Sequence, residues 1–344
     1  MMDILKHLFA LQYLLMIVFI MMVAGLAKEF NLFSPLFNYI KNTFKNNKFV
    51  IVILSTIGGI LPIEGRVTVS AGILDTIAPK NPESRKKYGI IDYISTHHYY
   101  MWSPLEKTVI LPIAAFGLTY MGWLTIVWPL LVISFLFIFW YIHTQMKDID
   151  IQIENTEFKM SAVIRNIFPL ILTVALYIQT DNFILSFGLL SLYYMILTQT
   201  FNIRKLLSYI NWEVICTVAI VIVLGSIIKT YDKQLQSYIM NLGIEPTGFV
   251  SIAIFSFLGF AFSFLLGSSS KFIAFAILIT SLFGMQYFLW FFVIDYVGYL
   301  LSPTHKCFVI GNRYFNTPIA EYTKVVSAWC LCLLIITGFI TFIL

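Results

Sequence analysis

The chain has 344 residues, of which 59% are hydrophobic and 11% are charged, and its mean hydropathy is +0.86. Soluble domains average about 45–50% apolar and about 25% charged residues, so the composition excludes an ordinary soluble protein and predicts an all-α polytopic membrane protein. The net charge of +5 fits short cytoplasmic loops, and the basic residues lack the interleaved aromatic residues that would stack bases. We therefore expect the lipid bilayer as a partner and no nucleic acid.

The first apolar run, residues 8–27, predicts a retained membrane helix, because it leads into a basic segment and not into a small-residue cleavage site. Residues 28–48 are expected to form a basic loop. Since basic loops remain in the cytoplasm, we expect the N-terminus outside the cell, in a multi-pass protein of the inner (cell) membrane.

Residues 49–79 form an apolar stretch that a polar tip at residues 62–66 divides into two halves. Each half is roughly 20 Å long at about 1.5 Å per residue, which is too short to cross a hydrocarbon core of about 30 Å. The pattern predicts a re-entrant hairpin. The loop that follows is also basic, so the hairpin is expected to open from the cytoplasm.

A second interrupted stretch, residues 88–123, predicts a broken membrane helix. Its break at residues 102–107 contains Pro104, which removes a backbone donor and disfavours helix in the preceding residue. A helix at residues 124–142 should return the chain to the cytoplasm, and a connecting helix pair is expected within residues 146–211.

The second half of the chain repeats this order. We expect a crossing helix, an external polar loop, a re-entrant hairpin, a broken helix and a final helix at residues 213–229, 231–245, 246–284, 286–315 and 324–344. The hairpin tip lies at residues 267–271 and the helix break at residues 302–306.

The two breaks also share a sequence motif. Both contain Tyr-x-x-Ser-Pro-x-x-Lys, which begins at Tyr100 in the first half and at Tyr299 in the second. The chain crosses the membrane an odd number of times between matching elements, so the two halves should have opposite orientations. Residues 1–145 and 212–344 are therefore predicted to be two inverted repeats, as in transporters whose broken helices meet near the membrane midplane.

Charged residues gather at the tips and breaks. The cations outnumber the acids by four to two, and broken helices add free N–H groups, so the site favours an anion. The residues predicted to bind it are Gly65, Arg66, Ser103, Lys107, Ser268, Ser269, Ser270, Lys271, Ser302, Thr304, His305 and Lys306. Glu64 and Glu106 would balance charge or carry protons. In a second interpretation the lysines replace coupling cations and stabilise the empty tips.

Several other polar residues interrupt apolar segments. His97 and His98 could relay protons, but interfacial packing beside the neighbouring tyrosines is favoured. Asp75 and Asp295 are expected to be hydrogen-bond partners between helices rather than proton carriers. The four cysteines show no metal-ligand spacing with histidine and are expected to pack as small apolar residues; they are Cys216, Cys307, Cys330 and Cys332. No metal or cofactor is predicted.

The amino-acid sequences of the first hairpin tip and the second break resemble those of the domain-of-unknown-function 401 family of prokaryotic integral membrane proteins. The matching segments are Gly58-Gly59-Ile60-Leu61-Pro62 and Gly298-Tyr299-Leu300-Leu301-Ser302-Pro303-Thr304-His305. That family is grouped with the ion transporter superfamily, which includes citrate, gluconate, dicarboxylate and TRAP-type permeases. The resemblance implies two hairpins, a scaffold that often forms a homodimer, and elevator-like alternating access. The tips differ from the Ser-Asn-Thr tips with which the dicarboxylate branch holds sodium and carboxylate, so they indicate neither sodium coupling nor a dicarboxylate substrate. The coupling ion, sodium or proton, is not assigned.

These observations favour a secondary active transporter that moves a small, organic anion. An alternative is a cation/proton antiporter that uses Glu64 and Glu106 as carriers. A more distant alternative is an intramembrane enzyme. It is disfavoured because the chain has no His-Glu-x-x-His, Gly-x-Ser-x-Gly or Walker motif.

Overall fold

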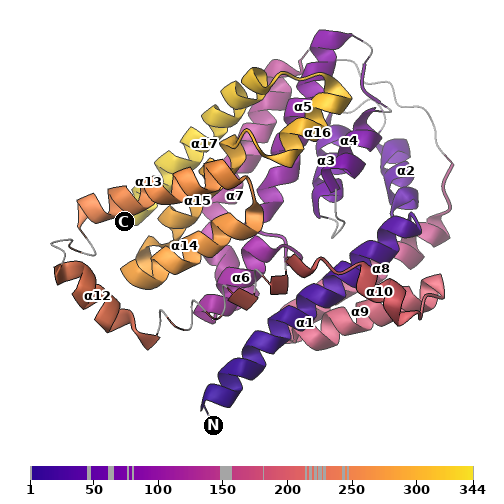
Figure 1. Ribbon diagram of the computed structural model, residues 1–344. Coiled ribbons are helices and arrows are strands. Elements are labelled where there is room, and N and C mark those ends of the chain that lie inside the picture. The colour runs from indigo at the N-terminus through magenta and orange to yellow at the C-terminus, as the bar shows by residue number, and fades with distance from the viewer. Residues whose placement is uncertain are drawn as a thin grey trace.

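A computed structural model gives the arrangement of the helices (Figure 1). It describes residues 2–44, 48–60, 66–75, 77–79, 81–147, 157–180, 182–213, 215–216, 219–220, 223, 227, 230–241, 245 and 248–343. Within these residues the protein is all-helical and contains no strand, which confirms the predicted all-α class. Glu64, Gly65 and much of the predicted helix at 213–229 lie outside the described residues.

The first half begins with two helices joined at a sharp bend. α1 (Met2–Glu29) is followed by α2 (Ser34–Thr43), and the two axes differ by 70°. The prediction of a continuous loop at residues 28–48 is therefore wrong. Pro35 stands in the first turn of α2, where its missing N–H costs nothing, and Phe37 and Ile40 give the short helix a buried face.

The segments predicted to form the first hairpin, the first broken helix and the helix that follows contain the next elements. They are α3 (Phe49–Ile60), α4 (Arg66–Asp75), α5 (Pro82–His97), the 3-10 turn η1 (His98–Met101), α6 (Lys107–Phe116) and α7 (Tyr120–Gln145). α6 ends earlier than the predicted residue 123, because Gly117 takes a left-handed conformation (φ +67°) that stops the helix. Thr119 then starts α7 by accepting a hydrogen bond from the backbone N–H of Gly122.

The second half follows a connecting region. The elements are α8 (Met160–Thr180), α9 (Phe183–Thr198), α10 (Ile203–Ser208), α12 (Asp232–Asn241), α13 (Phe249–Leu266), α14 (Ser269–Phe283), η2 (Met285–Tyr287), α15 (Phe288–Leu301), α16 (Lys306–Phe315) and α17 (Ile319–Phe342). The expected polar loop at residues 231–245 thus contains a helix, α12. A mixture of polar and apolar residues conceals such a helix, since neither type forms a long run.

Among the described residues, four helices are long and apolar enough to cross a membrane, namely α7, α8, α13 and α17, and up to six spans result if each bent pair counts as one. Their outward faces carry large apolar side chains, including Leu136, Ile171, Leu265 and Ile335. Leu265 leaves 70% of its surface exposed. A row of such residues is untenable in water but is the expected surface against lipid tails.

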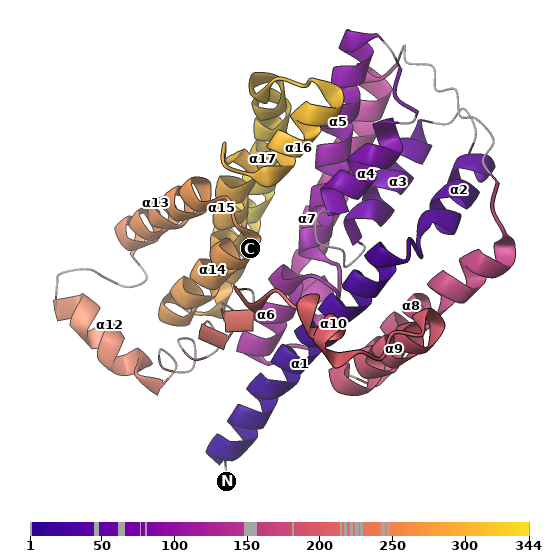
Figure 2. The ribbon, with the colours of Figure 1, turned by 45° about the vertical axis from the view of Figure 1, so that its right-hand side comes forward.

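The broken helices and hairpins form the central body of the molecule (Figure 2). α3 packs against α5, and α13 packs against α15. Each hairpin also reaches the other half of the chain: α4 packs on α16, and α14 packs on α6. The two long helices that follow the breaks, α7 and α17, lie side by side.

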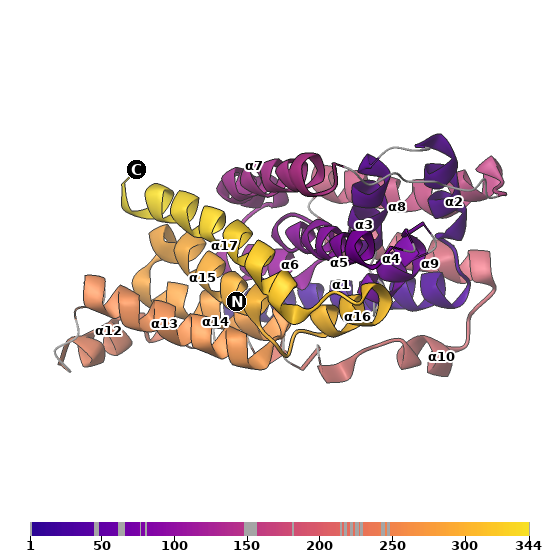
Figure 3. The ribbon, with the colours of Figure 1, turned by 90° about the horizontal axis from the view of Figure 1, so that it is seen from above.

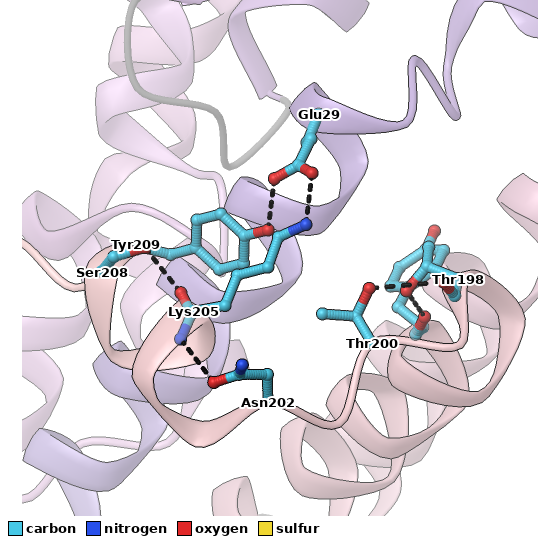
Figure 4. A network of polar contacts seen from close by, with 8 residues as sticks. Glu29, Thr198, Thr200, Asn202, Lys205, Ser208 and Tyr209 are labelled. Atoms are coloured by element: carbon cyan, nitrogen blue, oxygen red, sulfur yellow. Dashed lines mark hydrogen bonds and ion pairs between the residues drawn. The ribbon is translucent and has the colours of Figure 1, made fainter.

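A second group of helices lies beside this body. α1 packs along α9, α9 packs on α8, and α8 contacts α2 (Figure 2). Seen from above, α7 lies at one edge of the molecule and α10 at the other (Figure 3). The Glu29 carboxylate ties α10 to the end of α1 by accepting hydrogen bonds from Lys205 and from Tyr209 (Figure 4). Asn202 caps α10 by accepting hydrogen bonds from the backbone N–H groups of Arg204 and Lys205.

An ion pair fixes one end of the central body. Arg85 on α5 pairs with Asp75 at the end of α4, and it also donates to the backbone carbonyl of Tyr314 on α16, at 2.8 Å. Asp75 therefore links helices, as the sequence predicted. Because one guanidinium serves both halves of the chain, this contact holds the first hairpin against the second broken helix.

Close packing of α13 on α15 depends on Gly298. A Cβ atom there would lie 2.5 Å from the carbonyl oxygen of Phe260, which is backbone and cannot rotate away. We expect Gly298→Ala to reduce stability by roughly 1–3 kcal/mol, measured as a lower melting temperature of the detergent-purified protein. Gly188→Ala on α9 is the matched control, since its new Cβ meets only the Phe19 ring at 3.6 Å. Equal melting temperatures for the two variants would contradict the packing.

Candidate functional site at the helix breaks

Two Ser-Pro sequences interrupt the broken helices. η1 ends at Met101 and α6 begins at Lys107, while α15 ends at Leu301 and α16 begins at Lys306. Ser302 has an extended backbone (φ −62°, ψ 125°), because the ring of the following proline disfavours the helical conformation at that position. Each break therefore leaves two helix ends inside the protein.

The helices that restart after the breaks have uncapped N-termini. Glu106 precedes α6 and His305 precedes α16, and neither side chain caps the helix. The same holds for Ser268, which precedes α14 at the second hairpin tip. N–H groups without a side-chain cap leave partial positive charge at these three ends, which attracts anions.

The two breaks lie against each other through tyrosine residues. The Tyr100 and Tyr299 hydroxyls form a hydrogen bond of 2.8 Å, and the Tyr296 hydroxyl donates to the backbone carbonyl of His97 at 2.7 Å. Both pairs are separated by 199 residues. That is also the interval between Ser103 and Ser302 of the two Ser-Pro sequences, so each tyrosine contact joins positions that correspond in the two halves.

A buried histidine cluster lies beside these tyrosines. The Nε2 atoms of His97 and His305 are 3.2 Å apart, and the Tyr93 ring stacks on that of His97 with centroids 3.9 Å apart. The Tyr93 hydroxyl donates to the carbonyl of Leu300, at 2.8 Å, and lies 3.1 Å from Nδ1 of His305. His97 and His98 are fully buried among helices. The His97 ring packs against that of Tyr100, with centroids 5.6 Å apart, as the predicted packing beside the neighbouring tyrosines requires.

The second hairpin tip contacts the second break. Gly267 has a left-handed backbone (φ +53°), and a Cβ atom there would lie 2.5 Å from the Thr304 hydroxyl. The Thr304 hydroxyl is in turn 2.9 Å from that of Ser302. Two of the predicted site residues are thus brought together with the tip by a close approach that glycine permits.

The remaining predicted residues have varied surroundings. Ser103 is buried and accepts a hydrogen bond from the N–H of Leu105. Lys107 is half-buried, Lys306 is exposed, Ser269 is buried and Ser268 is half-buried. The side chains of Arg66, Ser270 and Lys271, at the starts of α4 and α14, lie outside the described part of the structure.

Three acids are buried in the described part of the central body. Glu106 is 3% exposed, and Asp92 and Asp295 are buried almost completely. The Ser70 hydroxyl donates to Asp92 at 3.3 Å. Asp295 packs against Gly259, where an added Cβ atom would lie 2.0 Å from Oδ1. Neither carboxylate oxygen of Asp295 has a hydrogen-bond partner among the described residues, so the hydrogen bond between helices that was predicted for Asp295 is wrong. Sequence reasoning missed Asp92 and Tyr93. A repeated tripeptide was present, since Ile-Asp-Tyr occurs at residues 91–93 and at residues 294–296, but its interval of 203 residues differs from the interval of 199 between the Ser-Pro sequences.

A cavity of about 670 Å³ opens on another part of the surface. It lies between α2 and the segment that leads into α8, and its lining includes Asn38, Asn42 and Lys159. None of the residues predicted to bind an anion lines it. The cavity is therefore not the site that the breaks define.

The helices and the apolar outer faces define an α-helical membrane-type protein with interrupted helices in its interior. The chain belongs to the family described as Protein of unknown function (DUF401), whose model matches residues 2–344. No curated protein matches the sequence.

The buried Tyr93 hydroxyl donates to the carbonyl of Leu300, just before the second break. The variant Tyr93→Phe tests how much this hydrogen bond stabilises the protein. Removing its hydroxyl leaves the buried Leu300 carbonyl without this donor, so we expect a loss of about 1–3 kcal/mol in stability. The melting temperature of the purified protein is the measurement. Tyr193→Phe is the control, because its hydroxyl donates to the carbonyl of Arg165 at an exposed position, where water can replace it. A Tyr93→Phe variant as stable as this control would show that the bond contributes little.

Proposed function

We propose that the protein is a secondary active transporter of the ion transporter superfamily that moves a small organic anion across the membrane. In this proposal residues 1–145 and 212–344 are inverted repeats, and an elevator-like motion of the central body alternates access to the site. The N-terminus lies outside and the basic loops lie in the cytoplasm.

One observation carries the proposal, namely the contact between corresponding residues of the two halves. When two copies of a unit are related by a two-fold axis, residues near the axis contact their own counterparts. Tyr100 with Tyr299, and His97 with Tyr296, are such pairs, at the offset that the repeated motif sets. These contacts support an axis that runs between the two breaks.

The packing of the hairpins supports the same symmetry. α4 of the first half packs on α16 of the second, and α14 of the second half packs on α6 of the first. Exchanging the two halves turns one contact into the other. Inverted repeats with broken helices at their interface are the architecture in which transporters bind substrate near the midplane.

The charge at the breaks supports an anion as the substrate. α4, α6 and α16 each begin with a cation, Arg66, Lys107 or Lys306, and Lys271 lies in the first turn of α14. Helix N-termini add partial positive charge. Hydroxyl groups of Ser302 and Thr304 at the tip-to-break contact are suited to donate to carboxylate oxygens.

The division of the helices supports an elevator motion. α1, α2, α8 and α9 pack mainly on one another, beside the body that contains both breaks (Figure 2). A scaffold of this kind can stay fixed in the membrane, or form a homodimer, while the body that carries the site moves.

The antiporter alternative is supported by the burial of Glu106 at the start of α6. A carboxylate inside the membrane is costly to keep charged, and such residues commonly carry protons or cations. In that case Glu64 or Glu106, and not the cations, would be indispensable.

A thermal-shift screen of the purified protein against small mono-, di- and tricarboxylates, with and without sodium and across pH, tests the proposal. A ligand of the folded state raises the melting temperature by mass action. We expect one carboxylate class to do so, and Arg66→Gln or Lys271→Gln to weaken its binding at least about tenfold, or about 1.4 kcal/mol. Arg204→Gln, an exposed cation on α10, is the matched control.

Uptake of that carboxylate into proteoliposomes gives the second readout. Transport that is unchanged in Arg66→Gln and Lys271→Gln would refute the anion site. A melting temperature that responds to cations or pH through Glu64 or Glu106, and to no carboxylate, would favour the antiporter.

A further inference from the structure

Three potential metal ligands meet where the two broken helices join. One nitrogen from each of His97 and His305 and the sulfur of Cys307 all lie within 4.8 Å of one another, and all three residues are buried. His97 ends α5, His305 precedes α16, and Cys307 lies in the first turn of α16. The cluster therefore spans both halves of the chain.

The hydrogen bonds of His97 assign its tautomer. Its Nδ1 lies 2.6 Å from the backbone carbonyl of Tyr93, and a carbonyl oxygen only accepts hydrogen bonds. Nδ1 therefore carries the proton. In a neutral imidazole the other nitrogen, Nε2, then has a lone pair and no proton.

The same argument applies to His305. Its Nδ1 lies 3.1 Å from the carbonyl of Tyr299, so this nitrogen donates. The Tyr93 hydroxyl, also 3.1 Å from Nδ1, gives its own proton to the Leu300 carbonyl. That hydroxyl can accept from the ring but cannot donate to it, so Nε2 of His305 also presents a lone pair.

Two lone pairs consequently face each other across the 3.2 Å between the Nε2 atoms. Two neutral acceptors repel at this distance, and a cation bound between or beside them, either a proton or a metal ion, would relieve this repulsion. Metal-binding histidines are held in this way, with the remote N–H donating to a backbone carbonyl that fixes the ring.

We propose that His97 Nε2, His305 Nε2 and Cys307 Sγ bind a thiophilic transition-metal ion, Zn²⁺ or Cu⁺. Imidazole and thiolate ligands together favour these ions over Mg²⁺, Ca²⁺ and Na⁺, which prefer oxygen. In this proposal His305 binds the metal ion and not the anion. The proposal does not depend on whether the chain is a transporter.

The geometry suits such an ion. Two nitrogens bound to one tetrahedral Zn²⁺ at about 2.0–2.1 Å are about 3.3 Å apart, close to the 3.2 Å between these rings. A sulfur at about 2.3 Å from the metal lies about 3.6 Å from each nitrogen. The ligand atoms of the three residues already lie within 4.8 Å of one another, so a small approach of Cys307 completes this geometry. The thiol loses its proton on binding.

The site would cross-link the two halves of the central body. One ligand belongs to the first broken helix and two belong to the second, with Tyr93 stacked on one ring and bonded to the other. A bound metal therefore fixes the two breaks to each other. Three protein ligands also leave one coordination position open.

The full chain, purified in detergent with its tag removed and stripped with a chelator, is titrated with Co²⁺. We expect one equivalent to bind, with a thiolate-to-cobalt charge-transfer band in the near ultraviolet, and Zn²⁺ to abolish that band. A parallel titration measures Cu⁺ by competition with a chromogenic chelator. The melting temperature should rise with the bound ion.

Cys307→Ser should abolish the charge-transfer band, and His97→Gln should weaken binding at least tenfold. Cys330→Ser, a buried cysteine on α17, and His143→Gln on α7 are the matched controls and should leave binding unchanged. Binding of Cu⁺ alone that is lost in Cys307→Ser supports the site and identifies a monovalent ion. Absence of stoichiometric metal binding by the wild-type protein, or a band that survives Cys307→Ser, overturns the proposal, and a proton shared by the two rings then explains their contact.

Discussion

A backbone that breaks inside a membrane must satisfy its polar groups within the protein, because lipid tails offer no hydrogen bonds. The two Ser-Pro breaks of this chain meet that constraint by facing each other. Tyr100 and Tyr299 pair across the junction, and the Tyr296 hydroxyl bonds to the carbonyl of His97. The Trp123 indole and the Thr108 hydroxyl donate to the carbonyls of Met101 and Tyr100 at the end of η1.

Polar and charged groups, which are costly to bury in a membrane, gather in the protein interior around this junction. The ends of helices, buried acids and two histidines share one interior region, while α7, α8, α13 and α17 turn their apolar faces outward. Two further sets of contacts join the halves away from the junction. Arg85 bonds to the backbone of α16, and each hairpin packs against the broken helix of the other half. In the proposed elevator motion, this body would move as a unit against α1, α8 and α9.

The helices and their breaks could be predicted because their signals are local. A proline fixes the break at residues 302–306, and α15 and α16 end and begin beside it. The short helices α2 and α12 could not be recognised in the same way, since each mixes polar and apolar residues without a long run. Gly117 also stopped α6 through a left-handed turn that the apolar pattern did not reveal.

The candidate site was only partly visible in the sequence. The Ser-Pro motif led to Ser302, Thr304 and His305, which do lie together at the second break. The pairing of His97 with His305 joins residues 208 apart, so no spacing rule could find it. Cys307 was dismissed as packing because only the fold brings a histidine from α5 beside it.

A double-mutant cycle between Tyr100→Phe and Tyr299→Phe tests the junction most directly. Stability of the two single variants and the double variant is compared with that of the unaltered protein in detergent. If the two hydroxyls bond to each other, the double variant should be less destabilised than the sum of the singles, by about 0.5–1.5 kcal/mol. Additive effects would mean that the breaks do not meet there, and the symmetric junction on which the proposed transport site rests would be contradicted.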